Sequence, residues 1–338
     1  MKKLWKYLLC LSALSVALTG CASEPEQDSA PATEPAAENS VTASETDAEA
    51  DEEENYNTGD AALDNIRNQD EIGDNEILVV SFGTSFNDSR RLTIGAIEDT
   101  IAEKFQDYEV RRSFTSDIII NHVQKRDGVL IDNVDAALQR ACDNQVKHLV
   151  IQPTHLMNGF EYQELVDQVA QYADAFEKVS FGEPLLTSDE DFERVAQAIV
   201  DWTAEYDNGE TAICFMGHGT EADSNAVYEK MQDILTEGGH TNYFIGTVEA
   251  EPSLDDVLAA VQSGEYKRVV LEPLMVVAGD HANNDMAGNE EDSWKTVFEQ
   301  AGYEVTCLLR GLGENEEIRQ IYAEHAQTAV DAAGTDTE

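Results

Sequence analysis

The feature that most constrains this chain is a regular alternation of short apolar runs and amphipathic segments between residues 76 and 332. Runs such as 77–83 and 148–153 have the length and continuous apolarity of strands that are buried on both faces. Segments such as 91–105 carry apolar residues at helical spacing. Strands that alternate with helices form parallel sheets covered by helices, so the sequence predicts an α/β protein.

The alternation runs through two comparable halves that join near residues 184–189. It predicts two doubly wound parallel-sheet domains with a central cleft, residues 74–187 and 188–338. The terminal helix, expected at 316–332, is long enough to pack back on the first domain. Strands are expected at 77–83, 108–114, 148–153, 178–182, 211–216, 242–248, 268–277 and 304–309.

The first 73 residues do not share this pattern. Residues 1–21 have a basic start, a short apolar stretch and the ending Leu-Thr-Gly-Cys, which resembles a bacterial lipoprotein signal with Cys21 as the lipidated residue. An ordinary signal peptide with an incidental cysteine is the alternative. Residues 22–73 are acidic and poor in large apolar side chains, which predicts a disordered spacer. We therefore expect an extracytoplasmic protein tethered to a membrane by lipid on Cys21.

Charge and motif content exclude some functions. The formal net charge is −47, and a nucleic-acid partner would require a basic face. The loop after the first expected strand lacks the GxGxxG spacing and the lysine of a P-loop, so no nucleotide is expected. The sequence leaves the oligomeric state open, with a homo-oligomer as one option.

Two histidines occupy similar settings, each after an apolar run and beside a glycine. His218 lies in Met-Gly-His-Gly, and His281 lies in Ala-Gly-Asp-His. In a parallel sheet such positions fall at the carboxyl ends of strands, where ligands bind. Imidazole binds divalent metals and titrates near neutral pH, so these residues are candidates for holding a metal, a proton or both.

The first domain offers further candidates after its strands. Glu161 begins a helix after the third strand and is a candidate metal ligand and proton acceptor. His155, in the loop before that helix, either contacts substrate or orients the loop. Amides and hydroxyls that could hold a substrate carboxylate are expected in the small-residue loop at Ser81, Gly83, Thr84 and Ser85. Arg112 is either a partner for substrate carboxylates or an ion-pair partner within the protein.

Several of these stretches together resemble the anaerobic sirohydrochlorin cobaltochelatases, which are related in fold to ferrochelatases. The similarity spans roughly residues 75–330. The longest motif runs from Pro273 to Met286 and contains Ala-Gly-Asp-His. The other matching stretches are 78–85, 112–116, 158–162, 215–219, 292–295 and 311–316.

The resemblance implies two α/β domains around a tetrapyrrole and ATP-independent insertion of Co²⁺, with cobalt as a substrate, into sirohydrochlorin. It implies metal-site roles for His218, His281 and Glu161. From the chemistry of imidazole and carboxylate we expect His218 and Glu161 to be catalytic, with His218 accepting a pyrrole proton. The lipoprotein signal is a departure from the family pattern, whose cytoplasmic members make cobalamin precursors inside the cell. Two alternatives therefore stay open: a lipoprotein that binds a metal or tetrapyrrole for uptake, and a chelatase for Fe²⁺ or Ni²⁺.

Overall fold

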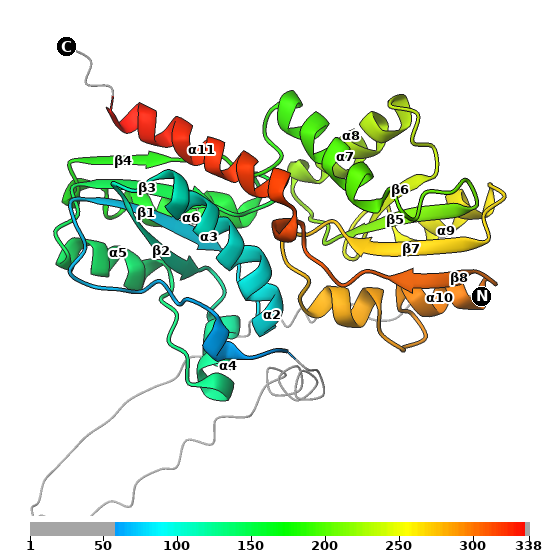
Figure 1. The fold of residues 1–338 in the computed structure, drawn as a ribbon, viewed down its shortest axis with the longest axis horizontal. Coiled ribbons are helices and arrows are strands. Elements are labelled where there is room, and N and C mark those ends of the chain that lie inside the picture. The colour runs from blue at the N-terminus through cyan, green and yellow to red at the C-terminus, as the bar shows by residue number, and fades with distance from the viewer. Residues whose placement is uncertain (1–57, 335–338) are drawn as a thin grey trace, which may run out of the picture. The chain divides into compact units, whose positions relative to one another are not determined.

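The computed structural model describes residues 58–334, which all belong to one compact unit (Figure 1). The predicted signal peptide, Cys21 and the spacer up to residue 57 lie outside the described residues. Within residues 58–334, no helix combines the length and the apolar character that crossing a membrane requires.

Residues 58–334 form two four-stranded sheets in which every pair of neighbouring strands is parallel. The predicted α/β class is therefore confirmed. The first sheet has the order β2-β1-β3-β4, and the second has the corresponding order β6-β5-β7-β8. The strands are β1 (Asn75–Ser81), β2 (Glu109–Phe114), β3 (His148–Pro153), β4 (Lys178–Phe181), β5 (Thr211–Gly217), β6 (Tyr243–Thr247), β7 (Arg268–Pro273) and β8 (Glu304–Cys307).

Helices connect successive strands within each sheet, as parallel pairing requires. Several begin at a serine or asparagine whose side chain accepts a backbone N–H of the first turn, among them Ser116 before α4 and Ser188 before α7. The main helices are α2 (Asn87–Arg90), α3 (Ala96–Lys104), α4 (Asp117–Asp127), α5 (Val134–Asp143), α6 (Phe160–Ala170), α7 (Asp189–Thr203), α8 (Ala226–Glu237), α9 (Leu254–Gln262), α10 (Trp294–Gln300) and α11 (Glu316–Gly334). Two segments are π-helical, η3 (Arg91–Gly95) after α2 and η6 (Ala282–Met286) directly after His281.

The seventh strand is shorter than the sequence pattern predicts. The expected strand covered residues 268–277, but β7 ends at Pro273. Proline has no N–H to donate to the ladder, and the chain then leaves the sheet through the apolar residues 274–277. Those residues instead lead to His281, which directly precedes η6.

The terminal helix α11 packs against α3, β3 and β4 of the first half. Its Tyr322 is fully buried, and the hydroxyl donates to the backbone carbonyl oxygen of Thr154 at 2.9 Å. This contact fixes the residues that follow β3 to an element from the far end of the chain.

The predicted disordered spacer extends too far toward the domain. Residues 58–73 are described, and they pack along the first sheet through specific polar contacts. Asp64 pairs with two buried arginines, and Asp70 pairs with Arg140. The prediction failed because it rested on acid-rich composition. Composition does not reveal which carboxylates have a cationic partner inside the fold.

Candidate metal centre

Three donor side chains meet at the carboxyl edge of the second sheet. His218 directly follows β5, Glu249 lies two residues after β6, and His281 follows the loop after β7. Because β5 pairs with both β6 and β7, these ends share one edge. One ligand atom from each of the three residues lies within 4.8 Å of the others. The two imidazole rings are 4.7 Å apart between centroids and nearly perpendicular.

The glycines around His218 set the position of its ring. A Cβ at Gly217 would collide with the ring of Tyr228, and Gly219 has a φ of +89° that favours glycine. The Tyr228 hydroxyl also accepts the Gly219 N–H at 3.2 Å. His218 Nδ1 lies 2.8 Å from the Gly219 carbonyl oxygen, which can only accept. Nδ1 therefore carries the hydrogen, and Nε2 keeps its lone pair for a metal or a proton.

A carboxylate orients His281 in a similar way. His281 Nδ1 lies 2.8 Å from Asp285 Oδ2, one helical turn further along η6. This hydrogen bond raises the pKa of His281, although partial burial acts in the opposite direction. An imidazole that donates one N–H to a carboxylate presents its other nitrogen in a fixed direction, as metal-binding histidines usually do.

Glu161 lies near these residues but outside the cluster of three. Burial raises the pKa of its carboxyl group, and the charge of His218 acts against that shift. Glu161 lies near the start of α6, at the carboxyl side of the first sheet. Its role as a metal ligand stays a prediction, and its raised pKa suits a group that exchanges a proton.

His155 is a buried neighbour of Glu161. Its Nε2 lies 3.8 Å from Glu161 Oε2, and its side chain is 7% exposed. Neither ring nitrogen hydrogen-bonds to any described residue, and burial lowers the pKa of His155 to about 4. The imidazole is thus neutral at pH 7, and a role in contacting substrate stays a prediction.

The loop predicted to hold substrate carboxylates has buried hydroxyl side chains, although Phe82 within it is 48% exposed. Ser81, Thr84 and Ser85 are each at most 4% exposed, and the Ser81 hydroxyl accepts a hydrogen bond from the Thr154 hydroxyl at 2.7 Å. Gly83 has a φ of +106°, and a Cβ at this position would collide with the ring of Phe114. These residues give the first sheet a tightly packed edge, so we correct their substrate-binding assignment to a structural one.

Arg112 is the second correction. It is fully buried and donates to Glu98 from Nε and Nη2, each at 2.7 Å, and to Asp64 from Nη1 at 2.6 Å. Burial alone would lower the pKa of the guanidinium, but the two carboxylates raise it above its usual value. No donor surface remains for a substrate carboxylate, so the internal ion pair is the role the structure supports.

Glu249 is the donor that sequence reasoning missed. It belongs to no motif, and its stretch Val-Glu-Ala-Glu resembles an ordinary acidic loop. One signal was available: Glu249 directly follows the expected strand 242–248, which is the next strand along the chain after the one that precedes His218. Two imidazole nitrogens and one carboxylate oxygen form a donor set suited to a divalent first-row metal, with coordination positions left for other ligands.

Comparison with known proteins now identifies the family. The model of the family described as cobalt chelatase (CbiK) matches residues 75–331. The chain belongs to the cobalt chelatase family. It is 37% identical over 257 residues to a sirohydrochlorin cobaltochelatase of Salmonella typhimurium, a match that covers 76% of this chain and 97% of the relative. It is 33% identical over 262 residues to sirohydrochlorin cobaltochelatase CbiKC of Nitratidesulfovibrio vulgaris, which covers 76% of this chain and 90% of that relative.

Solved structures agree at the level of the fold. SirB from Bacillus subtilis with Fe³⁺ superimposes with a TM-score of 0.54 at 13% identity, covering 78% of this chain and 98% of that one. The sirohydrochlorin chelatase SirB from Bacillus subtilis subspecies spizizenii, in complex with cobalt, gives a TM-score of 0.51 at 12% identity with the same coverage of both chains. The cobalt chelatase family member described here thus has a chelatase fold.

Proposed function

We propose that this protein inserts Co²⁺ into sirohydrochlorin, with cobalt as a substrate, at the carboxyl edge of the second sheet. The observation that carries the proposal is the cluster of His218, Glu249 and His281, whose ligand atoms lie within 4.8 Å of one another. Family membership and two relatives named as sirohydrochlorin cobaltochelatases support the choice of metal and ring.

Insertion exchanges one Co²⁺ for two pyrrole N–H protons, so the site must hold a metal and accept protons. His218, His281 and Glu249 receive the incoming ion, and Asp285 keeps the His281 ring aligned through its 2.8 Å contact. As the ring nitrogens take over the metal, Nε2 of His218 is released and accepts a pyrrole proton. Glu161 serves as a second proton acceptor near His218. No nucleotide takes part.

The donor set does not by itself select cobalt. Imidazole and carboxylate ligands also accept Fe²⁺ and Ni²⁺, and Ni²⁺ generally binds such sites more tightly than Co²⁺. Cobalt is therefore proposed from the relatives, and selectivity is measured by comparing the three ions at equal free concentration.

The decisive assay separates turnover from capture. Purified protein is mixed with excess sirohydrochlorin and Co²⁺, and the absorption change is compared with that of the spontaneous reaction. We expect many turnovers per protein and a loss of rate of at least about 100-fold in His218→Ala, with tetrapyrrole binding retained. One equivalent of complex per protein without turnover would instead support a binding lipoprotein for uptake.

For the cellular location, we propose that Cys21 is lipidated and that the enzyme works on the outer face of a membrane. The Leu-Thr-Gly-Cys ending of the apolar stretch and the acidic segment behind it support this. Wild type should fractionate with membranes and incorporate labelled fatty acid, whereas Cys21→Ser should do neither. Equal labelling of both forms would refute the anchor.

A further inference from the structure

A short segment before the family-matched region packs against α2 and two buried arginines. Residues 58–67, here called the N-terminal strap, precede the match that begins at residue 75. The Thr58 carbonyl oxygen accepts the Asp88 N–H at 2.8 Å, and the Gly59 carbonyl oxygen accepts from Asn87 Nδ2 at 3.1 Å. Both contacts hold the strap against α2, the helix that follows the loop after β1.

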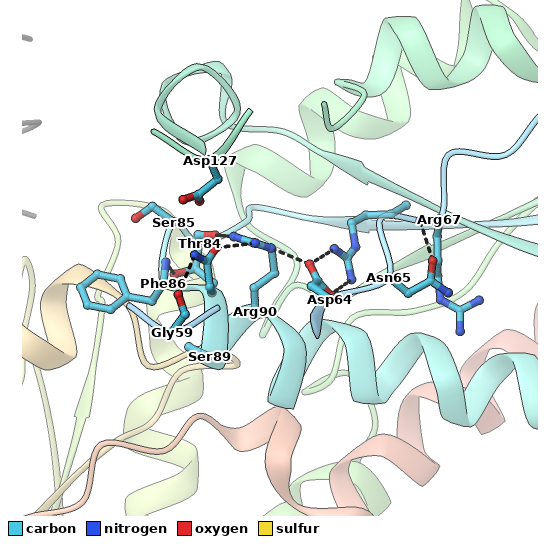
Figure 2. Close-up of polar contacts among 12 residues, drawn as sticks. Gly59, Asp64, Asn65, Arg67, Thr84, Ser85, Phe86, Ser89, Arg90 and Asp127 are labelled. Atoms are coloured by element: carbon cyan, nitrogen blue, oxygen red, sulfur yellow. Dashed lines mark hydrogen bonds and ion pairs between the residues drawn. The ribbon is translucent and has the colours of Figure 1, made fainter. Parts of the chain in front are cut away.

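Asp64 anchors the strap inside the fold. Its carboxylate is 2% exposed and accepts from Arg90 Nε at 2.7 Å and from Arg112 Nη1 at 2.6 Å (Figure 2). Burial would raise the pKa of Asp64, but hydrogen bonds and charges from the two arginines lower it overall. Two fully buried guanidinium groups thus depend on a residue that lies outside the family match.

Arg90 connects Asp64 to the loop that contacts the segment before His281. Its Nη1 donates to the Thr84 carbonyl oxygen at 3.2 Å, as Figure 2 shows. The Thr84 hydroxyl oxygen lies 3.0 Å from where a Cβ of Gly279 would stand, so the two segments are in close contact. Beside it, the Ser89 hydroxyl accepts the Ala278 N–H at 3.0 Å. Ala278 and Gly279 are the third and second residues before His281.

Apolar packing gives a second, independent connection. Ile66 of the strap and Val277 of the segment before His281 both pack against one buried cluster. The cluster consists of Ile94, Phe114, Val123 and Ile131. The strap and residues 277–279 therefore share both a polar and an apolar set of neighbours.

From these contacts we infer that the N-terminal strap is a positioning element for His281. It holds α2 and the loop after β1, which in turn fix residues 277–279 and so the separation of His281 from His218. Asp64 and Ser89 are positioning residues in this arrangement, since neither belongs to the donor cluster. The inference rests on the proposed metal site and adds to it a segment that the family match does not include.

The test is a double-mutant cycle read by metal affinity. The affinity of the full chain for Co²⁺ is measured by competition with a coloured chelator for wild type, Asp64→Asn, Ser89→Ala and the double variant. Outer contacts of metal ligands typically change affinity by about 10- to 100-fold, and we expect about tenfold for Asp64→Asn and less for Ser89→Ala. Because both act through the same segment, the double variant should lose less than the product of the single losses.

The matched control is Asp132→Asn. Asp132 also pairs with two arginines, Arg140 at 2.7 Å and Arg111 at 3.5 Å, and neither partner belongs to the strap, to α2 or to residues 277–281. It should lower the midpoint of unfolding and leave the Co²⁺ affinity of the folded protein unchanged. If Asp64→Asn does not fold, Ile66→Ala takes its place in the cycle.

Three results would overturn the inference. Asp64→Asn with wild-type Co²⁺ affinity, or losses that multiply independently with those of Ser89→Ala, would leave the strap a stabilising segment only. An equal loss of affinity in Asp132→Asn would show a general effect of destabilisation. Wild type that binds no Co²⁺ would instead remove the proposed metal site itself, so the two failures are distinguishable.

Discussion

The two sheets have corresponding strand orders, yet their carboxyl edges are used differently. At the edge of the first sheet, Ser81 and Thr154 bond to each other and are at most 4% exposed. At the edge of the second sheet, the side chains of His218 and Glu249 are 48% and 57% exposed, with donor atoms turned toward a common point. One topology thus places buried hydroxyls at the edge of one sheet and exposed metal donors at the edge of the other.

The difference extends to buried charge. β2 carries Arg111 and Arg112, both fully buried and paired with carboxylates, whereas its counterpart β6 has no charged residue. Buried ion pairs contribute little net stability but are costly to break on one side. The buried arginines of β2 are therefore structural, and the strand in the corresponding position of the second sheet has no such pair.

The largest expected effect tests whether Arg112 is structural. Arg112→Met would leave Glu98 and Asp64 without their main partner, and breaking a buried pair in this way costs about 3–5 kcal/mol. Denaturant unfolding measures the loss. A variant with wild-type stability and a raised KM for sirohydrochlorin would restore the substrate role of Arg112.

The next effect concerns the buried imidazole of the first half. His155 has a folded pKa of about 4, against 6.5 for a free imidazole, so the unfolded chain takes up its proton first as pH falls. The stability that comes from keeping His155 neutral is complete above pH 6.5 and is lost progressively between pH 6.5 and about pH 4. This amounts to roughly 3 kcal/mol at 1.36 kcal/mol per pKa unit. His155→Gln should unfold with a flatter pH dependence across that window, and an unchanged slope would contradict this.

A third prediction compares the two carboxylates near His218. Glu249→Gln removes a proposed ligand and should weaken Co²⁺ affinity by about 10- to 100-fold, or roughly 1.4–2.7 kcal/mol. Glu161→Gln should lower kcat but keep Co²⁺ affinity near that of wild type, because Glu161 is proposed to accept a proton rather than to bind the metal. Calorimetric titration and steady-state kinetics separate these cases. The reverse pattern would return the ligand role to Glu161.

The smallest expected effect tests whether the buried hydroxyls at the edge of the first sheet are structural. Ser81→Ala removes the acceptor of the Thr154 hydroxyl, which should cost about 1 kcal/mol of unfolding free energy. The KM for sirohydrochlorin should stay unchanged. A tenfold rise in KM at wild-type stability would show that this loop does contact substrate.

Much of the fold was predictable because buried parallel strands have continuous apolar runs. The expected strand 148–153 coincides with β3, and each of the eight expected strands has a counterpart among residues 58–334. The error at residues 274–277 arose because an apolar run does not show where a ladder stops, although Pro273 indicated it. The strap was missed because the partners of Asp64 come from distant strands and helices.

The site was predictable where glycine spacing constrained the backbone. His218 and His281 were each expected at the carboxyl end of a strand, and their rings are in contact. Glu249 had no such signal, since only the neighbouring position of β6 identifies it. Arg112 was misassigned to substrate because residue type alone does not distinguish a guanidinium that faces a ligand from one already paired inside the protein.

The most direct test of the metal centre is a crystal structure of the protein with Co²⁺, using anomalous scattering at the cobalt edge. We expect one strong peak at the carboxyl edge of the second sheet, about 2 Å from a nitrogen of His218, a nitrogen of His281 and an oxygen of Glu249. A peak bound by Glu161 or His155, with neither His218 nor His281 among its ligands, would contradict the account.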